Sequence, residues 1–184
     1  MPPQSALPQG PTTSRSPSPG RTPSLAERVA RLEARQEIEE LKYRYLRACD
    51  HKDPEEFRAC FVREGADIDY GELGAFATVD DLVGLFRRIA LARDGEGHRV
   101  LDMHHGLHPR ITFRSPTEAD GRWTLRFRQL DLAGRTERVL CGEYDDRYVV
   151  EDGAWRLARH HFRSLWSLTR PLPEGYAVDE GGLL

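Results

Sequence analysis

Apolar residues in the first part of the chain recur at steps of three and four, the spacing typical of an amphipathic helix. The recurring residues are Leu25, Val29, Leu32, Ile38, Leu41, Tyr45 and Cys49. Ser24 and Glu27 have the spacing of a capping box, so the helix is expected to begin after Ser24. Its length favours a break or bend near residues 34–36, and it is expected to end at Asp50.

Two shorter helices are predicted further along the chain. The segment 53–61 has Asp53 as a helix cap and Pro54 at the first helical position. The segment 79–93 carries a set of apolar residues on one face: Leu82, Leu85, Phe86 and Ile89. Between these helices, "ADIDYGELGAFAT" is strand-like sequence interrupted by glycine turns.

After the glycine-rich loop at 94–97, the period changes from helical to alternating. Four strands separated by turn sequences are predicted: Val100–Arg114, Arg122–Leu132, Thr136–Val150 and Ala154–Leu168. In the second, Trp123, Leu125 and Phe127 alternate with polar residues, as in a half-buried antiparallel strand. Helices followed by antiparallel strands indicate an α+β fold, in which a curved sheet wrapped around three N-terminal helices encloses a cavity.

The two ends of the chain differ in composition from this central part. Residues 1–23 are rich in Pro, Ser, Thr, Gln and Gly, and such a segment is expected to be a disordered arm. Residues 171–184 are rich in Pro and Gly and are expected to form an extended tail. A single domain is therefore predicted over residues 24–170.

Composition and charge narrow the function classes. The chain has 184 residues, of which 39% are hydrophobic, and a net charge of −3. Nucleic acids and anionic membranes both require a basic face, so neither partner is expected. The sequence contains neither an apolar run long enough to cross a membrane nor the apolar centre of a secretory signal. A cytoplasmic location is expected.

A histidine-rich stretch, "LDMHHGLHPRITF", raises the alternative of a metal site. The histidines concerned are His104, His105 and His108, together with His160 and His161 nearer the C-terminus. The His-x₃-His spacing suits metal ligands on a helix, but Gly106 and Pro109 disfavour a helix here. Neither Cys nor Glu joins the set at ligand spacing, so no metal is expected.

Several short motifs follow one another in an order that resembles a known family. They are Tyr-x₄-Asp at residues 45–50, "GELGAFATVDDLVGLF", His-x₃-His-Pro-x-Ile from His104, Gly-x-Tyr-x-Asp at 142–146 and "DGAWRL". The series resembles the SnoaL-like branch of the nuclear transport factor 2-like superfamily over residues 25–168. That branch is related to scytalone dehydratase, bile-acid 7α-dehydratase and hexachlorocyclohexane dehydrochlorinase. The resemblance implies a cone-shaped α+β barrel with a central pocket and a homo-oligomer, either a dimer or a trimer.

The resemblance also implies a catalytic pair. In members with elimination chemistry, an Asp near the end of the first helix works with a His on the strand after the third helix, which here are Asp50 and His104. A carboxylate bonded to one imidazole nitrogen fixes the tautomer and raises the basicity of the other nitrogen. Tyr45 can stabilise a developing enolate or protonate a departing hydroxyl. Some relatives use an Arg in the last strand at a position that corresponds here to His160.

These considerations predict a cofactor-independent lyase or isomerase that acts on a hydrophobic small molecule, by a dehydratase-type β-elimination. His104 is the base, Asp50 orients it and Tyr45 is the hydrogen-bonding acid. The predicted substrate-binding residues are His108, His160, Tyr144, Asp146, Phe76 and Trp123.

Other interpretations remain open at this stage. Asp50 can cap the turn that follows the helix, and Tyr45 can be a core tyrosine with a satisfied hydroxyl. His104 alone can be structural. The same fold also serves as a non-catalytic ligand- or protein-binding scaffold, as in the small subunits of ring-hydroxylating oxygenases. A polyketide cyclase-like role would use the pocket without this pair.

Overall fold

The computed structural model describes residues 22–178 and 180–181. Its three helices are α1 (Leu25–Asp50), α2 (Pro54–Ala59) and α3 (Val79–Ala90). Short elements lie between α2 and α3: β1 (Asp67–Asp69), the 3-10 turn η1 (Gly71–Leu73) and β2 (Ala75–Phe76). The remaining strands are β3 (Arg93–Asp94), β4 (Gly97–His98), β5 (Val100–Ser115), β6 (Glu118–Asp131), β7 (Thr136–Glu151) and β8 (Ala154–Pro171). Among the described residues, none of the helices has the length and apolar character needed to cross a membrane.

Side-chain caps start each helix where the sequence predicts it. Ser24 and Glu27 form the expected capping box, and a second box joins Thr78 to Asp81 at the start of α3. Asp53 accepts two backbone N–H groups at the start of α2. The structure contains no break near residues 34–36, because α1 is a single helix from Leu25 to Asp50.

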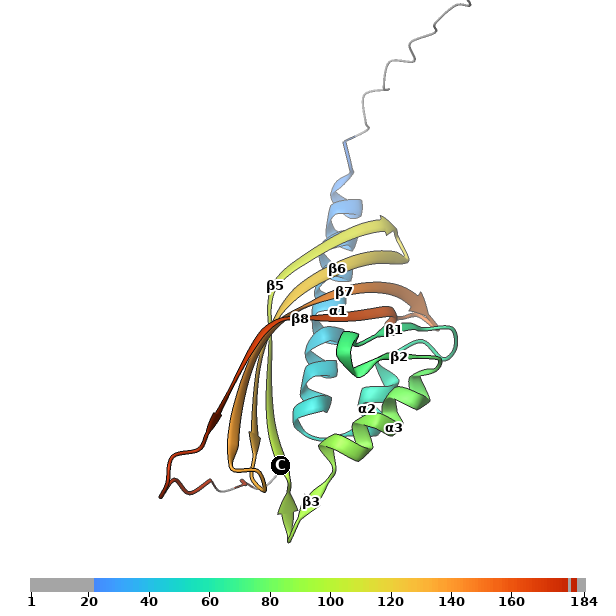
Figure 1. The fold of residues 1–184 in the computed structure, drawn as a ribbon. Helices are drawn as coiled ribbons and strands as arrows, with labels where there is room; N and C mark the ends of the chain where they lie inside the picture. Colours follow the sequence, from blue (N-terminus) through green and yellow to red (C-terminus); the bar gives the residue numbers. More distant parts are fainter. Residues whose placement is uncertain (1–21, 179, 182–184) are drawn as a thin grey trace, which may run out of the picture.

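One six-stranded sheet organises the molecule, with the strand order β2-β1-β8-β7-β6-β5. Strands β5 to β8 pair antiparallel in sequence order, and β1 joins the edge of β8 in parallel. The long strands bend strongly, and α1 lies in the hollow of the bend beside α2 and α3 (Figure 1). The α+β architecture predicted from the sequence is therefore confirmed.

Several predicted boundaries and faces need correction. Strand β6 begins at Glu118 rather than Arg122, because only Pro116 and Thr117 separate it from β5. Helix α3 ends at Ala90, and on its predicted apolar face Leu82 is buried, Leu85 and Phe86 are half-buried, and Ile89 is 42% exposed. The first three apolar residues of α1 are also exposed: Leu25, Val29 and Leu32. The start of the helix extends past the sheet, which is consistent with the exposure of these three side chains (Figure 1).

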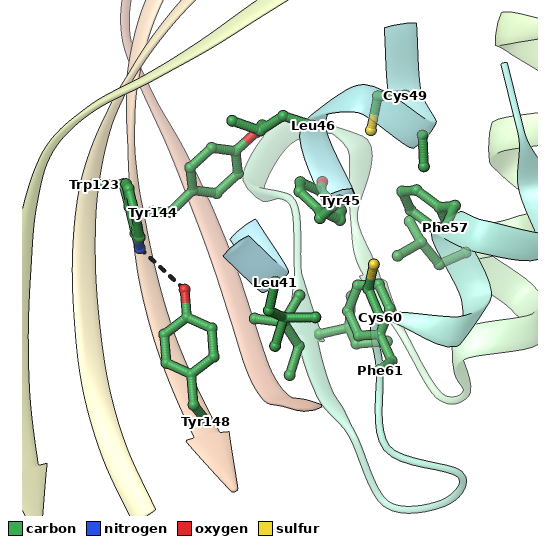
Figure 2. Close-up of a cluster of buried hydrophobic side chains, with 14 of the residues drawn as sticks. Leu41, Tyr45, Leu46, Cys49, Phe57, Cys60, Phe61, Trp123, Tyr144 and Tyr148 are labelled. Atoms are coloured by element: carbon green, nitrogen blue, oxygen red, sulfur yellow. Dashed lines mark hydrogen bonds between the residues drawn. The ribbon is translucent and has the colours of Figure 1, made fainter. Parts of the chain in front are cut away.

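The core lies between α1 and the inner face of the sheet, with α2 and α3 closing one side. Figure 2 shows part of it, with Leu41 and Tyr45 of α1 opposite Trp123, Tyr144 and Tyr148 of the sheet. Glycines on adjacent strands make room for these large side chains. A Cβ at Gly106 would lie 2.7 Å from Leu46, and one at Gly121 would lie 2.6 Å from the Tyr148 ring. These two glycines thus leave room on the inner face for Leu46 and for the Tyr148 ring.

The described residues include only part of the predicted N-terminal arm and of the predicted C-terminal tail. Most of the predicted disordered arm, residues 1–21, lies outside the described residues. In the predicted tail, the Glu180 carboxylate accepts the backbone N–H of His98 at 2.8 Å and lies 2.5 Å from its ring Nδ1. The described part of the tail is therefore attached to β4. With one chain described, the expected homo-oligomer stays a prediction.

Candidate functional site

The C-terminal end of α1 brings Asp50 against strand β5. Both carboxylate oxygens accept the backbone N–H of His104, at 3.0 and 3.1 Å, and Oδ1 lies 2.6 Å from Nδ1 of the His104 ring. An ionised carboxylate only accepts hydrogen bonds, so in the neutral imidazole Nδ1 carries the proton and Nε2 keeps a lone pair. No hydrogen bond to Nε2 is found within the described part of the chain. The side chains of His104 and Asp50 are 16% and 24% exposed, so solvent-sized molecules reach the pair.

A second contact holds the same helix end on the same strand. Lys52, two residues after Asp50, donates to Asp102 at 2.9 Å, and both side chains are almost fully buried. Gln129 of β6 donates to the other oxygen of Asp102. The His104 ring packs against Phe127, with centroids 4.6 Å apart. Two adjacent tethers and a ring contact therefore fix the orientation of the His104 imidazole.

Tyr45 lies apart from this pair. Its hydroxyl is 2.6 Å from the hydroxyl of Tyr70, and its ring is 4.7 Å from the ring of His160. No hydrogen bond from Tyr45 to Asp50 or His104 is found among the described residues. Burial raises the pKa of the Tyr45 hydroxyl well above its usual value, so it stays protonated and available as a donor.

Tyr144 lies close enough to Asp50 and Asp146, two carboxylates predicted from the sequence, for their charges to affect its pKa. Burial is the main reason that its pKa is raised well above the usual value, and the charges of Asp146 and Asp50 add to the effect. Its ring stacks on His160 at 4.8 Å. Tyr144 thus links the region of Asp50 to a second polar centre.

That second centre is built on Asp146, which is completely buried. Its carboxylate accepts from Lys42 Nζ at 2.9 Å and from the Tyr148 hydroxyl at 2.6 Å, and it lies 2.6 Å from Nδ1 of His160. Trp123 donates to the Tyr148 hydroxyl at 3.0 Å, a contact drawn in Figure 2. These five side chains form one buried network that joins α1 to three neighbouring strands.

Charge balance decides the protonation states in this network. Burial alone would raise the pKa of Asp146, but the Lys42 charge and the hydrogen bonds from His160 and Tyr148 outweigh it and lower the pKa to about 2. Burial, together with the nearby Lys42 charge, lowers the pKa of His160 to about 4. Asp146 is therefore ionised and His160 neutral at neutral pH.

The remaining predicted substrate-binding residues, among them His108 and Phe76, do not lie in a single pocket with Asp50 and His104. His108 is exposed, lies within the break in the β5–β6 register between Leu107 and Arg110, and has a positive φ of 54°. It lines a cleft of about 640 Å³ together with Trp123 and Tyr144. Phe76 is half-buried beside Tyr70. Neither Asp50 nor His104 lines this cleft, so the structure does not bring all the predicted residues into one pocket.

A family model described as a SnoaL-like domain matches residues 30–161. The chain belongs to the SnoaL-like family. No curated protein is significantly similar in sequence to this SnoaL-like chain.

Solved structures share the SnoaL-like fold. A candidate scytalone dehydratase from Novosphingobium aromaticivorans is 26% identical, with a TM-score of 0.69 over 82% of this chain and 99% of that one. A hexachlorocyclohexane dehydrochlorinase from Novosphingobium barchaimii is 18% identical, with a TM-score of 0.68 over 83% and 99% of the two chains. A candidate aromatic ring hydroxylase from N. aromaticivorans is 16% identical, with a TM-score of 0.64 over 76% and 94%.

Sequence reasoning missed two members of the buried network, Lys42 and Tyr148, and it also missed Tyr70, whose hydroxyl pairs with that of Tyr45. Lys42 carried a detectable signal, because it lies on the apolar stripe of α1, four residues after Ile38 and three before Tyr45. A lysine at such a position needs a buried anionic partner. No comparable signal distinguished Tyr70, whose position depends on the contact between η1 and β8.

Proposed function

We propose that this SnoaL-like protein is a cofactor-independent lyase or isomerase in which His104 acts as the general base. The observation that supports this most strongly is the geometry of the Asp50–His104 pair. Asp50 holds the proton on Nδ1, and the opposite ring nitrogen is left as an unpaired acceptor on a partly exposed side chain. This is the arrangement that general-base catalysis by histidine requires.

In the proposed reaction, Nε2 of His104 removes a proton from a carbon beside a carbonyl group or ring. The electron pair of the broken C–H bond forms a new C=C bond, and the β-hydroxyl leaves with a second proton as water. The negative charge of Asp50 stabilises the imidazolium that forms. Return of the proton to another carbon, without loss of water, would instead give isomerisation.

The hydroxyls of Tyr45, Tyr70 and Tyr144 are the proposed donors to the developing oxygen charge. Burial raises the pKa of each well above its usual value, so all three remain protonated at neutral pH. Tyr45 bonds to Tyr70 rather than to His104. We therefore assign the acid role to the three tyrosine hydroxyls together and not to Tyr45 alone.

A hydrophobic, ring-containing substrate fits the side chains that surround the polar groups of the candidate site. The polar groups are surrounded by aromatic rings, among them Phe57, Phe61 and Phe162. The names of two structural neighbours, a candidate scytalone dehydratase and a hexachlorocyclohexane dehydrochlorinase, both describe eliminations from ring compounds. Scytalone and hexachlorocyclohexane are therefore the first substrates to test.

The test compares wild type with H104A and D50N on these two compounds, following product by liquid chromatography. Both variants are expected to lose activity by about 100-fold or more, the usual contribution of a positioned base. H105A is the matched control, because His105 is the neighbouring residue on β5 and is exposed. Full turnover by folded H104A contradicts the proposal.

A non-catalytic binding scaffold is the second candidate, and one observation favours it. Asp50 accepts the backbone N–H of His104 as well as the ring, so the pair also serves to attach α1 to β5. In that case ligand binding would survive in H104A, and wild type would turn over neither compound.

A further inference from the structure

A cleft of about 400 Å³ over strands β5 to β8 is lined by four arginines and two aspartates. They are Arg110, Arg114, Arg122, Arg159, Asp120 and Asp145. Successive side chains of a strand point to opposite faces of the sheet, and Gly121 and Trp123, on either side of Arg122, face the core. Arg122 and its cross-strand partners Arg110 and Asp145 therefore project from the face that points away from α1.

The two aspartates do not balance the charge of the four arginines. Asp120 accepts a hydrogen bond from Arg114 at 2.6 Å. Asp145 is shared between two arginines, because it accepts from Arg159 and also lies 3.7 Å from Nε of Arg122. The cleft therefore has an excess of two positive charges, in a chain whose net charge is −3.

The register of the strands places like charges directly opposite one another around this cleft. Arg110 is the cross-strand partner of Arg122, and Arg147 is that of Arg159. Such pairs of like charge destabilise a sheet. Arg110 is exposed and forms neither an ion pair nor a hydrogen bond within the described part of the chain, and Nε of Arg159 is buried without a partner there. A bound anion would separate the like charges and accept from these unused donors.

We propose that this cleft binds the phosphate group of a small phosphate monoester. A phosphate monoester carries close to two negative charges at neutral pH, which matches the excess in the cleft. Its oxygens suit the planar fork of the arginine guanidinium, which forms bidentate hydrogen bonds to phosphate. The exposed Thr112 hydroxyl, which also lines the cleft, is a further donor.

The rest of the ester has space beside the phosphate. The cleft of about 640 Å³ shares Arg110, Arg122 and Asp145 with the smaller one, so the two are continuous. Trp123 and Phe162 are among the residues that line the larger cleft, and their rings favour an aromatic ester.

Other anions fit these surroundings less well. A carboxylate carries a single negative charge, so it leaves half of the excess uncompensated. A nucleic acid needs a basic surface that continues along its backbone. The acidic residues Asp69 and Glu143 line the larger cleft and oppose a second phosphate there. The site therefore suits one phosphate group on a small molecule.

This inference goes beyond the proposed function, because neither Asp50 nor His104 lines either cleft. The test is calorimetry on the full-length chain at pH 8 and constant ionic strength, with phenyl phosphate, benzoate and inorganic phosphate as probes. Phenyl phosphate is expected to bind at least tenfold more tightly than benzoate, which has the same ring and one negative charge less. Inorganic phosphate is expected to bind more weakly than phenyl phosphate, because it lacks the ring.

Substitutions localise the binding. R110M is expected to weaken the binding of phenyl phosphate at least tenfold, and it should fold normally because Arg110 is exposed and has no partner in the described part of the chain. R126M is the matched control. Arg126 is an exposed arginine on the same face of β6 and lines neither cleft, so R126M is expected to bind as wild type does.

Three results would overturn the proposal of a phosphate site: no binding of phenyl phosphate, equal binding of phenyl phosphate and benzoate, or equal weakening by R110M and R126M. Inorganic phosphate that binds as tightly as phenyl phosphate, or more tightly, would identify the free ion as the ligand and overturn the proposal of an ester. The comparison of probes in wild type stands even if R110M fails to fold.

These outcomes are separate from those of the proposed function. H104A is expected to bind phenyl phosphate as wild type does, because His104 lines neither cleft. Full turnover by H104A would refute the role of His104 and leave the phosphate site in place. Failure of phenyl phosphate to bind would refute the phosphate site without changing the expected loss of activity in H104A.

Discussion

Asp50 makes two kinds of hydrogen bond, one to the backbone of β5 and one to an imidazole. The first attaches the end of α1 to the sheet, and the second fixes the tautomer of His104. A capping or tethering role and a catalytic role are therefore compatible in this residue. Substitutions separate them, because an amide retains an acceptor and a methyl group does not.

D50A is expected to lower the free energy of unfolding by about 1–3 kcal/mol, since it leaves the His104 N–H without its acceptor. D50N is expected to cost less, because its amide oxygen can still accept that N–H. Urea unfolding of both variants measures the difference. Equal stability of D50A and wild type would show that the tether contributes nothing.

His160 is expected to make stability depend on pH. Its pKa is about 4 in the folded chain, against 6.5 ordinarily, so between these values the unfolded chain binds more protons. Stability is therefore lost as the pH falls from 6.5 towards 4, by about 3 kcal/mol from this group. The groups near it are Lys42, Asp146, the hydroxyls of Tyr45, Tyr70 and Tyr144, and the neighbouring His161, whose charge has the smallest effect of those that act on the pKa.

Urea unfolding at several pH values between 4 and 7 measures this effect. H160Q is expected to show a smaller loss over the same interval, because glutamine does not titrate. H161Q serves as the control and is expected to keep the wild-type slope. A wild-type slope in H160Q would assign the pH dependence to other groups.

At the scale of elements, α1 is held in the sheet by a buried ion pair between Lys42 and Asp146. K42M is expected to lower the free energy of unfolding by about 3–5 kcal/mol, because it leaves the Asp146 charge buried with less compensation. R35M on the same helix removes a part-exposed pair with Glu39 and is expected to cost about 0–1 kcal/mol. Similar values for K42M and R35M in thermal or urea unfolding would contradict this.

Replacing Gly121 or Gly84 with alanine is expected to change the stability of the fold in opposite directions. G121A places a Cβ 2.6 Å from the Tyr148 ring inside the buried network, and overpacking of this kind typically costs about 1–3 kcal/mol. G84A lies in the middle of α3 with its nearest neighbour, the end of Arg88, at 3.6 Å, and is expected to stabilise by about 0.5–1 kcal/mol. Calorimetric unfolding temperatures that move together would contradict the assignment of Gly121 to a packing contact.

The elements themselves were predictable because their signals are local. Caps at Ser24, Asp53 and Thr78 and alternation along the strands depend only on residues close in sequence. The start of β6 was missed because "SPTEADG" resembles a turn throughout, whereas Ala119 within it is 0% exposed in the sheet. The pairing of Asp146 with His160 depends on the register of β7 against β8, which no local pattern specifies.

On the scale of the whole molecule, the bent sheet and α1 create two polar centres instead of the single pocket expected from the sequence. Asp50 and His104 lie where the C-terminal end of α1 meets β5, whereas Asp146 of β7 and His160 of β8 meet the helix at Lys42, eight residues before Asp50. Tyr144 is within electrostatic reach of both carboxylates. We propose that one centre transfers the proton from carbon and that the other holds the substrate.

The most direct test of this account follows the proton itself. Substrate carrying deuterium at the carbon beside the carbonyl or ring, beginning with scytalone, is incubated with wild type, H104A and H105A, and loss of the label is followed by NMR. The account predicts that wild type and H105A release the label and that H104A does so at least about 100-fold more slowly. Equal release by H104A and wild type would contradict the assignment of His104 as the base.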